Sequence, residues 1–521
     1  MSLTAKVDLL NSPEKAVHLS GIARGIEKES LRVEASGNLA QTPHPKALGS
    51  ALTHPNVTTD FSEALLEFIT APSPSIDTVM QQLEEIHQVA YRHIDQELLW
   101  ASSMPCQMGS SEDIPIGNYG SSNIGMMKTV YRRGLGHRYG RLMQTIAGIH
   151  YNFSVPDSLW IELQKNSSNT QSLRDFKSEG YFSLIRNFRR YSWLLLYLLG
   201  AAPAICRSFV RNQEHKLIPV GADTHSLYQP YATSLRMGDL GYQSDAQSSL
   251  VVNYNNLQQY TDTLSDALSS PYTPYDHIGL TDQDGDYQQL NTHLLQIENE
   301  FYSSIRPKRT AASGETPVHA LTNRGVEYIE VRCIDVNPLL PNGIDEETIR
   351  FLDTFLLFCL LEDSPKTDDT ESSYISENIA RTVYSGRDPA LKLIQSGVEI
   401  SLRKWATSLL KKMSPVSSLL DTANKTDKYT EVHSAMCSRV DDANKTPAAK
   451  LLKEMESKQE TYFGMAMRKA EEHKSYFTSK ILSPATQKEY DMLARESVKR
   501  QSSIEANDSL SFKEFLADYY R

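Results

Sequence analysis

The chain has 521 residues, of which 40% are hydrophobic and 22% charged, and its formal net charge is -11 at pH 7. This is the composition of a globular protein, long enough for one large catalytic unit or for two to three smaller ones. Nucleic acid and anionic membranes are disfavoured as partners, because binding to either relies on clustered Lys and Arg.

The start of the chain reads MSLTAKVDLLNSPEK and lacks the basic start, apolar run and cleavage site of a secretory signal, so we expect a cytoplasmic protein.

The cysteines are scattered, without a CxxC pair or the spacing of a zinc site, and we expect reduced thiols. This spacing leaves one disulfide open but does not choose its pair. The five cysteines are Cys106, Cys206, Cys333, Cys359 and Cys437.

Two acidic segments come first along the chain. Residues 26–31 carry acidic side chains at alternate positions, which in a β-strand puts Glu27 and Glu29 on one face. Residues 58–70 add Asp60 and Glu67. The second pattern fits either a helix or, over its later half, a strand.

Two helices are predicted next. The first is amphipathic, packs on a sheet and follows a Pro-rich segment, with apolar residues at helical spacing at Val79, Leu83, Ile86 and Ala90. The second lies in residues 191–206, the most apolar stretch of the chain. It is too short to cross a bilayer comfortably and contains Pro203, so we expect a buried helix that ends in a turn and no membrane partner.

The alternating strand pattern recurs in residues 149–155 and 328–333, and more weakly in residues 296–301. The first two each have an apolar face for the core. Their opposite faces are polar and carry His150, Asn152 and Ser154 in the first and Tyr328, Glu330 and Arg332 in the second.

Helix signals dominate after a polar seam at residues 364–373. Ser483 before Pro484 reads as a helix cap, and Ser511 with Glu514 as a capping box. We therefore predict a catalytic core over residues 1–365 and a helical C-terminal region over residues 366–521 packed on it.

The polar strand faces have two interpretations. Each could face water, as one side of many antiparallel sheets does. Taken together, however, they are rich in Glu with His and Asn, which strands usually avoid. If these side chains converge in one cavity, their repulsion requires cations, and oxygen-rich ligation with one imidazole favours Mg²⁺ or Mn²⁺. Such a site holds nucleotide phosphates in many enzymes, and the chain has no GxxxxGK[ST] or GxGxxG loop that would do so instead.

Six ordered motifs over the first two-thirds of the chain resemble the proteobacterial type of glutamate–cysteine ligase. They are GIEKESLRV (25–33), ALGSALTHPNVTTDFSEALLEFIT (47–70), LMQTIAGIHYNFSVP (142–156), PYATSLRMGDLGY (230–242), LQIENEFYSSIRPKR (295–309) and GVEYIEVRCIDVNP (325–338). Residues 364–521 carry little of this resemblance.

The resemblance implies an α+β fold, in which an antiparallel sheet curves into a funnel like that of the glutamine synthetase catalytic part and helices pack outside. It also implies site residues. The metal ligands would be Glu27, Glu29, Asp60, Glu67, His150 and Glu330. The substrate contacts would be Tyr131, Arg132, Leu135, Gln144, Tyr242, Asn299 and Tyr302, with Tyr131 and Leu135 on one face of a helix. Arg236 and Arg332 would act in catalysis.

The implied reaction joins the γ-carboxylate of L-glutamate to the amino group of L-cysteine, with ATP as co-substrate and Mg²⁺, or Mn²⁺, as cofactor. Two alternative functions are also considered. One is a carboxylate–amine ligase that uses another amine, and the other is a non-catalytic metal- or nucleotide-binding protein. We expect small-molecule substrates, no nucleic-acid partner, and a monomer or weak oligomer.

Overall fold

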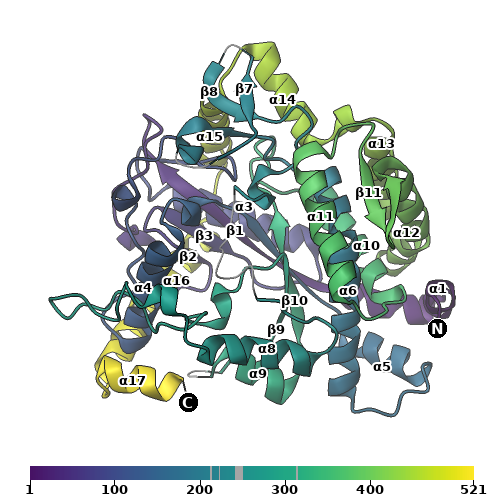
Figure 1. The fold of residues 1–521 in the computed structure, drawn as a ribbon, viewed down its shortest axis with the longest axis horizontal. Helices are drawn as coiled ribbons and strands as arrows, with labels where there is room; N and C mark the ends of the chain where they lie inside the picture. The colour runs from purple at the N-terminus through teal and green to yellow at the C-terminus, as the bar shows by residue number, and fades with distance from the viewer. Residues whose placement is uncertain (212–213, 222, 241–249, 313–314, 521) are drawn as a thin grey trace.

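The polar-faced strands pair in one antiparallel sheet at the centre of Figure 1. The computed structural model describes residues 1–211, 214–221, 223–240, 250–312 and 315–520. In this part of the chain the sheet has seven strands in the order β2-β3-β1-β5-β10-β9, with β4 beside β1. The strands are β1 (Ala23–Val33), β2 (Val57–Thr59), β3 (Leu65–Ile69), β4 (Leu98–Leu99), β5 (Ile149–Ser154), β9 (Ile305–Lys308) and β10 (Tyr328–Ile334).

The register of the sheet brings the acidic residues of separate segments onto one face. Residues paired directly across antiparallel strands project to the same side of the sheet. The relevant pairs are Glu29 with Glu67, Glu27 with His150, and Glu330 with both Asn152 and Arg306. A continuous polar face therefore runs across β3, β1, β5, β10 and β9.

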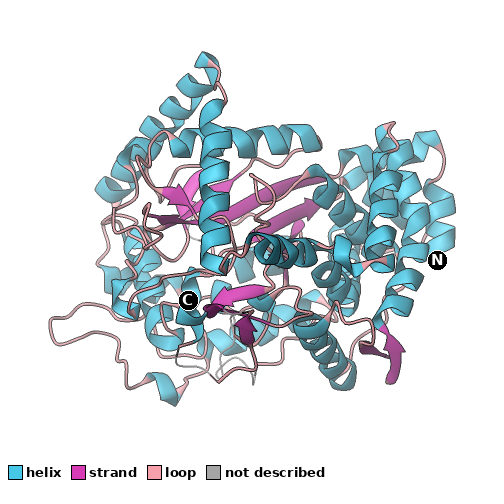
Figure 2. Ribbon diagram, turned by 90° about the horizontal axis from the view of Figure 1, so that it is seen from above, coloured by secondary structure: helices cyan, strands magenta, loops and turns pink. Residues whose placement is uncertain are grey.

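The opposite face of the sheet is the core side. Ile26, Tyr151 and Val331 are fully buried there, against helices that enclose the strands in Figure 2. Among the described residues of the first two-thirds, the helices are α1 (Leu3–Leu10), α2 (Pro13–Ala16), α3 (Ile76–Tyr91), α4 (Asn123–Tyr139), α5 (Asp157–Lys165), α6 (Leu173–Leu199), α8 (Leu257–Ser269), α9 (Pro317–Arg324) and α10 (Glu346–Leu361).

The C-terminal third is helical apart from one hairpin, β11 (Lys392–Gln395) with β12 (Val398–Ser401). Its helices are α11 (Asp369–Ser385), α12 (Leu402–Asn424), α13 (Lys428–Asp441), α14 (Pro447–Lys458), α15 (Tyr462–Ser479), α16 (Pro484–Asn507) and α17 (Phe512–Tyr519). Helices α12 and α13 pack on α10, and α15 packs on α3. A separate three-stranded sheet is formed by β6 (Ala204–Cys206), β8 (Asp223–Tyr228) and β7 (Ile218–Val220).

Several predicted helix ends are confirmed. Ser483 caps α16 through the backbone N–H of Thr486, and Ser511 and Glu514 form the capping box of α17. The apolar residues after position 191 form the buried end of α6, which stops before Gly200. No helix among the described residues has the length and apolar character to span a membrane.

The ambiguous residues 58–70 form strands β2 and β3, so the helical alternative is wrong. The strand predicted at residues 296–301 is also wrong, because the chain turns there through a 3₁₀ helix, η8 (Glu298–Glu300). Buried polar contacts override the short alternating pattern of residues 296–301. Glu300 accepts hydrogen bonds from the backbone N–H of Gln296 and from Arg138, which hold the turn.

The expectation of reduced thiols is wrong for one pair of cysteines. Cys106 and Cys206 form a disulfide with Cα atoms 5.4 Å apart, although 100 residues separate them in sequence. Their proximity depends on the placement of β6 beside the loop after β4, which local sequence does not encode. Cys333, Cys359 and Cys437 are free.

This disulfide predicts a labelling pattern. In protein unfolded without reductant, we expect an alkylating agent to modify the three free thiols, and two more after reduction. Intact-mass spectrometry before and after reduction counts the added groups. Five additions without reductant would contradict the disulfide.

His54 is a buried histidine whose ring accepts hydrogen bonds from the backbone. Its Nδ1 accepts from the N–H groups of Asn56 and Val57, at 3.1 and 3.0 Å. Burial, assisted by the nearby charge of Arg500, lowers the pKa of His54 to about 4. In the unfolded chain the His54 ring binds a proton near pH 6.5, whereas in the folded chain it does so only near pH 4. The stability from neutral His54 is therefore complete above about pH 6.5 and is lost as the pH falls towards 4.

A His54→Asn variant tests this pH dependence, because the Asn side-chain oxygen can accept the same two N–H groups but does not titrate. We expect the loss in unfolding free energy between pH 8 and pH 5 to be about 2 kcal/mol smaller in the variant. Urea denaturation at both pH values measures the difference, and the comparison cancels any packing change that is common to both. Equal losses in the two proteins would contradict the prediction.

Candidate functional site

The polar face of the sheet forms the floor of a cavity of about 650 Å³. Side chains of the sheet, of α4 and of the segment around η8 enclose it. The predicted site residues that line this cavity are Glu27, Glu29, Asp60, Glu67, Tyr131, Arg132, Leu135, Gln144, His150, Arg236, Asn299, Tyr302, Glu330 and Arg332. Tyr242 lies outside the described residues. Apart from it, the structure brings the whole predicted set to one place.

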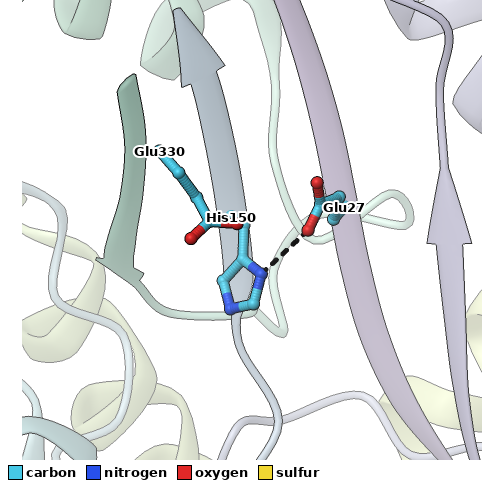
Figure 3. Close-up of side chains that lie close together, drawn as sticks. All are labelled: Glu27, His150 and Glu330. Atoms are coloured by element: carbon cyan, nitrogen blue, oxygen red, sulfur yellow. Dashed lines mark hydrogen bonds and ion pairs between the residues drawn. The ribbon is translucent and has the colours of Figure 1, made fainter. Parts of the chain in front are cut away.

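Two groups of ligand atoms meet around His150, which lies on β5 between the acidic residues of its neighbours. In each group the ligand atoms lie within 4.8 Å of one another. The first group is Glu27, His150 and Glu330, contributed by three adjacent strands (Figure 3). The second is Glu29, Glu67 and His150. Asp60 lines the same cavity but belongs to neither group.

Short contacts hold the first group in place. The Nδ1 of His150 lies 3.1 Å from Glu27 Oε2, and Asn152 donates from Nδ2 to Glu27 Oε1 at 2.8 Å. Glu330 is 2% exposed and lies 3.1 Å from Arg332 Nη1 and 3.4 Å from Lys308 Nζ. These carboxylates therefore have orientations set by neighbouring strands.

The carboxylates differ in how well their charge is compensated. Burial raises the pKa of Glu330, but Lys308 and Arg332 outweigh it and hold that pKa well below its usual range. The pKa of Glu67 lies well above its usual value, because the residue is buried and faces Glu27, Asp60 and Glu29. Burial likewise raises the pKa of Glu29. The β3 side of the cavity thus has negative charge that its own cations do not balance.

This donor set suits a divalent cation. It consists of carboxylates with one imidazole and no thiolate, which is the chemistry that hard cations prefer. A bound cation would also relieve the repulsion that raises the pKa values of Glu29 and Glu67. Glu27, Glu29, Glu67, His150 and Glu330 could hold such ions through the two groups, and Asp60 offers a further carboxylate in the same cavity.

Two arginines face the acidic groups. Arg332 lies on β10 beside Glu330, and its Nη1 is 3.5 Å from His150 Nδ1. Arg236, in the 3₁₀ helix η6 (Leu235–Met237), is 4% exposed and donates to the Arg332 carbonyl at 2.9 Å. Gly148 permits this arrangement, because a Cβ there would lie 2.0 Å from Arg236 Nη2.

The apolar side of the cavity belongs to α4. Tyr131 and Leu135 lie one helical turn apart and both line it, with Arg132 between them. Gln144 follows in the 3₁₀ helix η4 (Met143–Thr145) and is 4% exposed. Asn299 lies within η8 and Tyr302 just after it, and both also line the cavity.

Nine further lining residues were not predicted from the sequence: Phe61, Tyr139, Met143, Ile146, Glu300, Phe301, Arg306, Lys308 and Ser376. Arg306 and Lys308 lie on β9, and Arg306 is paired directly with Glu330. Their alternation around Pro307 was the available signal, but a basic segment with proline resembles a loop. Ser376, on α11, gave no local signal, because only the tertiary fold brings this helix to the cavity.

Comparisons with known proteins agree with this geometry. A family model described as glutamate–cysteine ligase matches residues 7–382. The glutamate–cysteine ligase of Alcanivorax borkumensis is 50% identical over 522 residues, covering 99% of each chain, and that of Pseudomonas putida strain W619 is 51% identical over 95% of this chain and 94% of the relative.

A crystal structure of the glutamate–cysteine ligase of Francisella tularensis in complex with AMP superposes with a TM-score of 0.90, at 37% identity, over 96% of this chain and 97% of the other. A bifunctional glutathione synthetase from Pasteurella multocida shares the fold at 23% identity, with a TM-score of 0.72 over 92% of this chain and 57% of the other. The similarity to relatives extends through the C-terminal third, where the sequence motifs indicated little resemblance. The chain belongs to the glutamate–cysteine ligase family.

Proposed function

We propose that the protein uses ATP to join the γ-carboxylate of L-glutamate to the amino group of L-cysteine, giving γ-glutamylcysteine, ADP and phosphate, the first step of glutathione synthesis. The observation that carries this proposal is the meeting of two carboxylate–imidazole groups with Arg236 and Arg332 in one cavity. The AMP bound to the Francisella tularensis relative supports a nucleotide as substrate.

Mg²⁺, or Mn²⁺ in its place, is the cation that we propose for Glu27, Glu29, Asp60, Glu67, His150 and Glu330. When bound, it would supply positive charge to the phosphate oxygens of ATP. The donor set supports this assignment, because carboxylate oxygens dominate it.

In the first step an oxygen of the glutamate γ-carboxylate attacks the γ-phosphorus of ATP. The bond from that phosphorus to the bridging oxygen breaks, and ADP leaves with the electron pair. Negative charge spreads over the oxygens of the transferring group, and we assign its stabilisation to the guanidinium groups of Arg236 and Arg332, which line the cavity. The product is γ-glutamyl phosphate, which has phosphate as a good leaving group.

In the second step the neutral amine of cysteine attacks the acyl carbon, the carbon–oxygen bond to phosphate breaks, and the proton that the amine loses ends on the departing phosphate. We assign the amine substrate to the wall made by Tyr131, Arg132, Leu135, Gln144, Asn299 and Tyr302, together with Tyr242. Tyr131 and Leu135 support this role, because an apolar wall can orient a small side chain and exclude water that would hydrolyse the intermediate. No cysteine of the protein is needed as a nucleophile.

The test supplies ATP, glutamate, magnesium and a series of amines, and follows the release of ADP. We expect cysteine to give the highest kcat/KM. If alanine or ammonia served equally well, the protein would be a ligase with another amine. If no amine stimulated ADP release, the non-catalytic alternative would gain support.

We also propose a cytoplasmic location, where ATP and reduced cysteine are available, and a monomer or weak oligomer.

A further inference from the structure

The C-terminal end of the chain packs behind the cavity wall. After α16 the chain crosses residues 508–511 and forms α17, which lies against α4 (Figure 1). We call residues 508–520 the C-terminal strap. The strap is more than 360 residues distant in sequence from α4, yet α4 carries Tyr131, Arg132 and Leu135.

The contact between the strap and α4 has an apolar cluster of its own, distinct from the main core. Phe512 and Leu516 of the strap are buried against Met127 and Val130 of α4 and against Leu290. Tyr131 packs at the edge of this cluster. Without the strap, the outer face of α4 would expose this apolar surface, so the position of the wall depends on burial against α17.

Hydrogen bonds attach the strap to the start of α4. Asp508 accepts from the backbone N–H of Asn123, and Asn123 Nδ2 donates to the Leu510 carbonyl at 3.0 Å. A carboxylate at the first turn of a helix also interacts favourably with the helix dipole. The N-terminal end of α4 is therefore held by the strap itself.

A second connection runs through Gln296, which is fully buried. Tyr520 donates to the Gln296 carbonyl at 2.8 Å, and Gln296 Nε2 donates to the Tyr131 carbonyl at 3.2 Å. The side-chain oxygen of Gln296 accepts from the N–H of Leu290 at 2.9 Å. Gly134 allows Gln296 to lie this close to α4, because a Cβ there would be 2.2 Å from Gln296 Oε1.

The same network reaches η8. The N–H of Gln296 donates to Glu300 Oε2, and Glu300 Oε1 accepts from Arg138 of α4 at 2.9 Å. Helix α4 and η8 are thus joined through Glu300, which itself lines the cavity. Gln296 and the strap do not line the cavity themselves.

We propose that the C-terminal strap and Gln296 are positioning elements that set the amine side of the cavity. This inference rests on the proposed function, because it takes Tyr131 and Leu135 as contacts of the amine substrate. Loss of the strap should let α4 move outward. This movement should weaken the binding of cysteine more than the binding of ATP.

Three variants test the proposal: Gln296→Met, which keeps the side-chain volume but removes its hydrogen bonds, Tyr520→Phe, and a chain ending at residue 510. For Gln296→Met and the shortened chain we expect KM for cysteine to rise about tenfold, and for Tyr520→Phe about threefold, with KM for ATP unchanged. The matched control is Tyr476→Phe, which removes another hydroxyl, bonded to Glu84 of α3 and outside both the cavity lining and the strap cluster, and should leave both KM values unchanged.

The outcomes separate this proposal from the proposed function. Absence of cysteine-dependent ADP release in the unaltered protein would refute the function. An active protein whose folded variants keep the cysteine KM, or raise the KM for ATP equally, would overturn the positioning role. A purely structural role would lower the melting temperature and the active fraction without changing KM. If the shortened chain does not fold, Gln296→Met and Tyr520→Phe decide.

Discussion

Replacement of Glu330 with Gln is expected to lower cysteine-dependent ADP release by about 10²- to 10³-fold while the chain stays folded. Glu330 is buried and contributes to the ligand group with Glu27 and His150. The substitution removes its negative charge but keeps its shape. The pKa of Glu330 is held well below the usual range, so the native side chain is ionised at neutral pH and the loss of charge is complete.

Turnover is measured by coupled detection of ADP, and folding by circular dichroism and thermal unfolding. Glu327→Gln is the matched control, because Glu327 lies next to the start of β10 in a 3.7 Å pair with Arg309 but does not line the cavity. It should retain activity close to that of the unaltered protein. Full activity in Glu330→Gln would mean that the acidic residues are structural.

Replacement of Asp353 with Ala is expected to reduce the free energy of unfolding by about 3–5 kcal/mol. Asp353, on α10, is fully buried and lies 3.0 Å from Arg24 Nη2 of β1. It also accepts from the hydroxyls of Tyr151, at 2.6 Å, and Tyr429, at 3.2 Å. Its removal leaves a buried guanidinium without its partner, and such a charge cannot regain water.

Urea denaturation measures this loss. Asp441→Asn is the control, because Asp441 pairs with Arg403 at 3.1 Å on the surface, where such a pair contributes less than about 1 kcal/mol. A loss in Asp353→Ala as small as that of the control would contradict the prediction. Arg24 and Tyr151 lie on β1 and β5, the two strands that carry Glu27 and His150. The variant therefore also measures how much the Asp353 contacts stabilise these two strands of the cavity floor.

Period-two patterns predicted the strands that matter most. Residues 26–31 and 328–333 lie in β1 and β10, and all but the last of residues 149–155 form β5, because a strand with one buried face must alternate its side chains. The same rule failed at residues 296–301, where buried contacts of Glu300 favour a turn. Pattern alone could not distinguish helix from strand at residues 58–70, since pairing of β3 with β1 decides it.

The residue types of the site followed from local sequence and from the family resemblance, and these identified carboxylates, an imidazole and guanidinium groups suited to phosphoryl transfer. Which of them meet was decided by the register, which sets Glu29 beside Glu67 and Glu27 beside His150. The roles of Lys308, Ser376, Gln296 and the C-terminal strap, and the pairing of Cys106 with Cys206, arise from contacts between distant segments. Local sequence determines which face a side chain takes, whereas packing of the whole chain determines its neighbours.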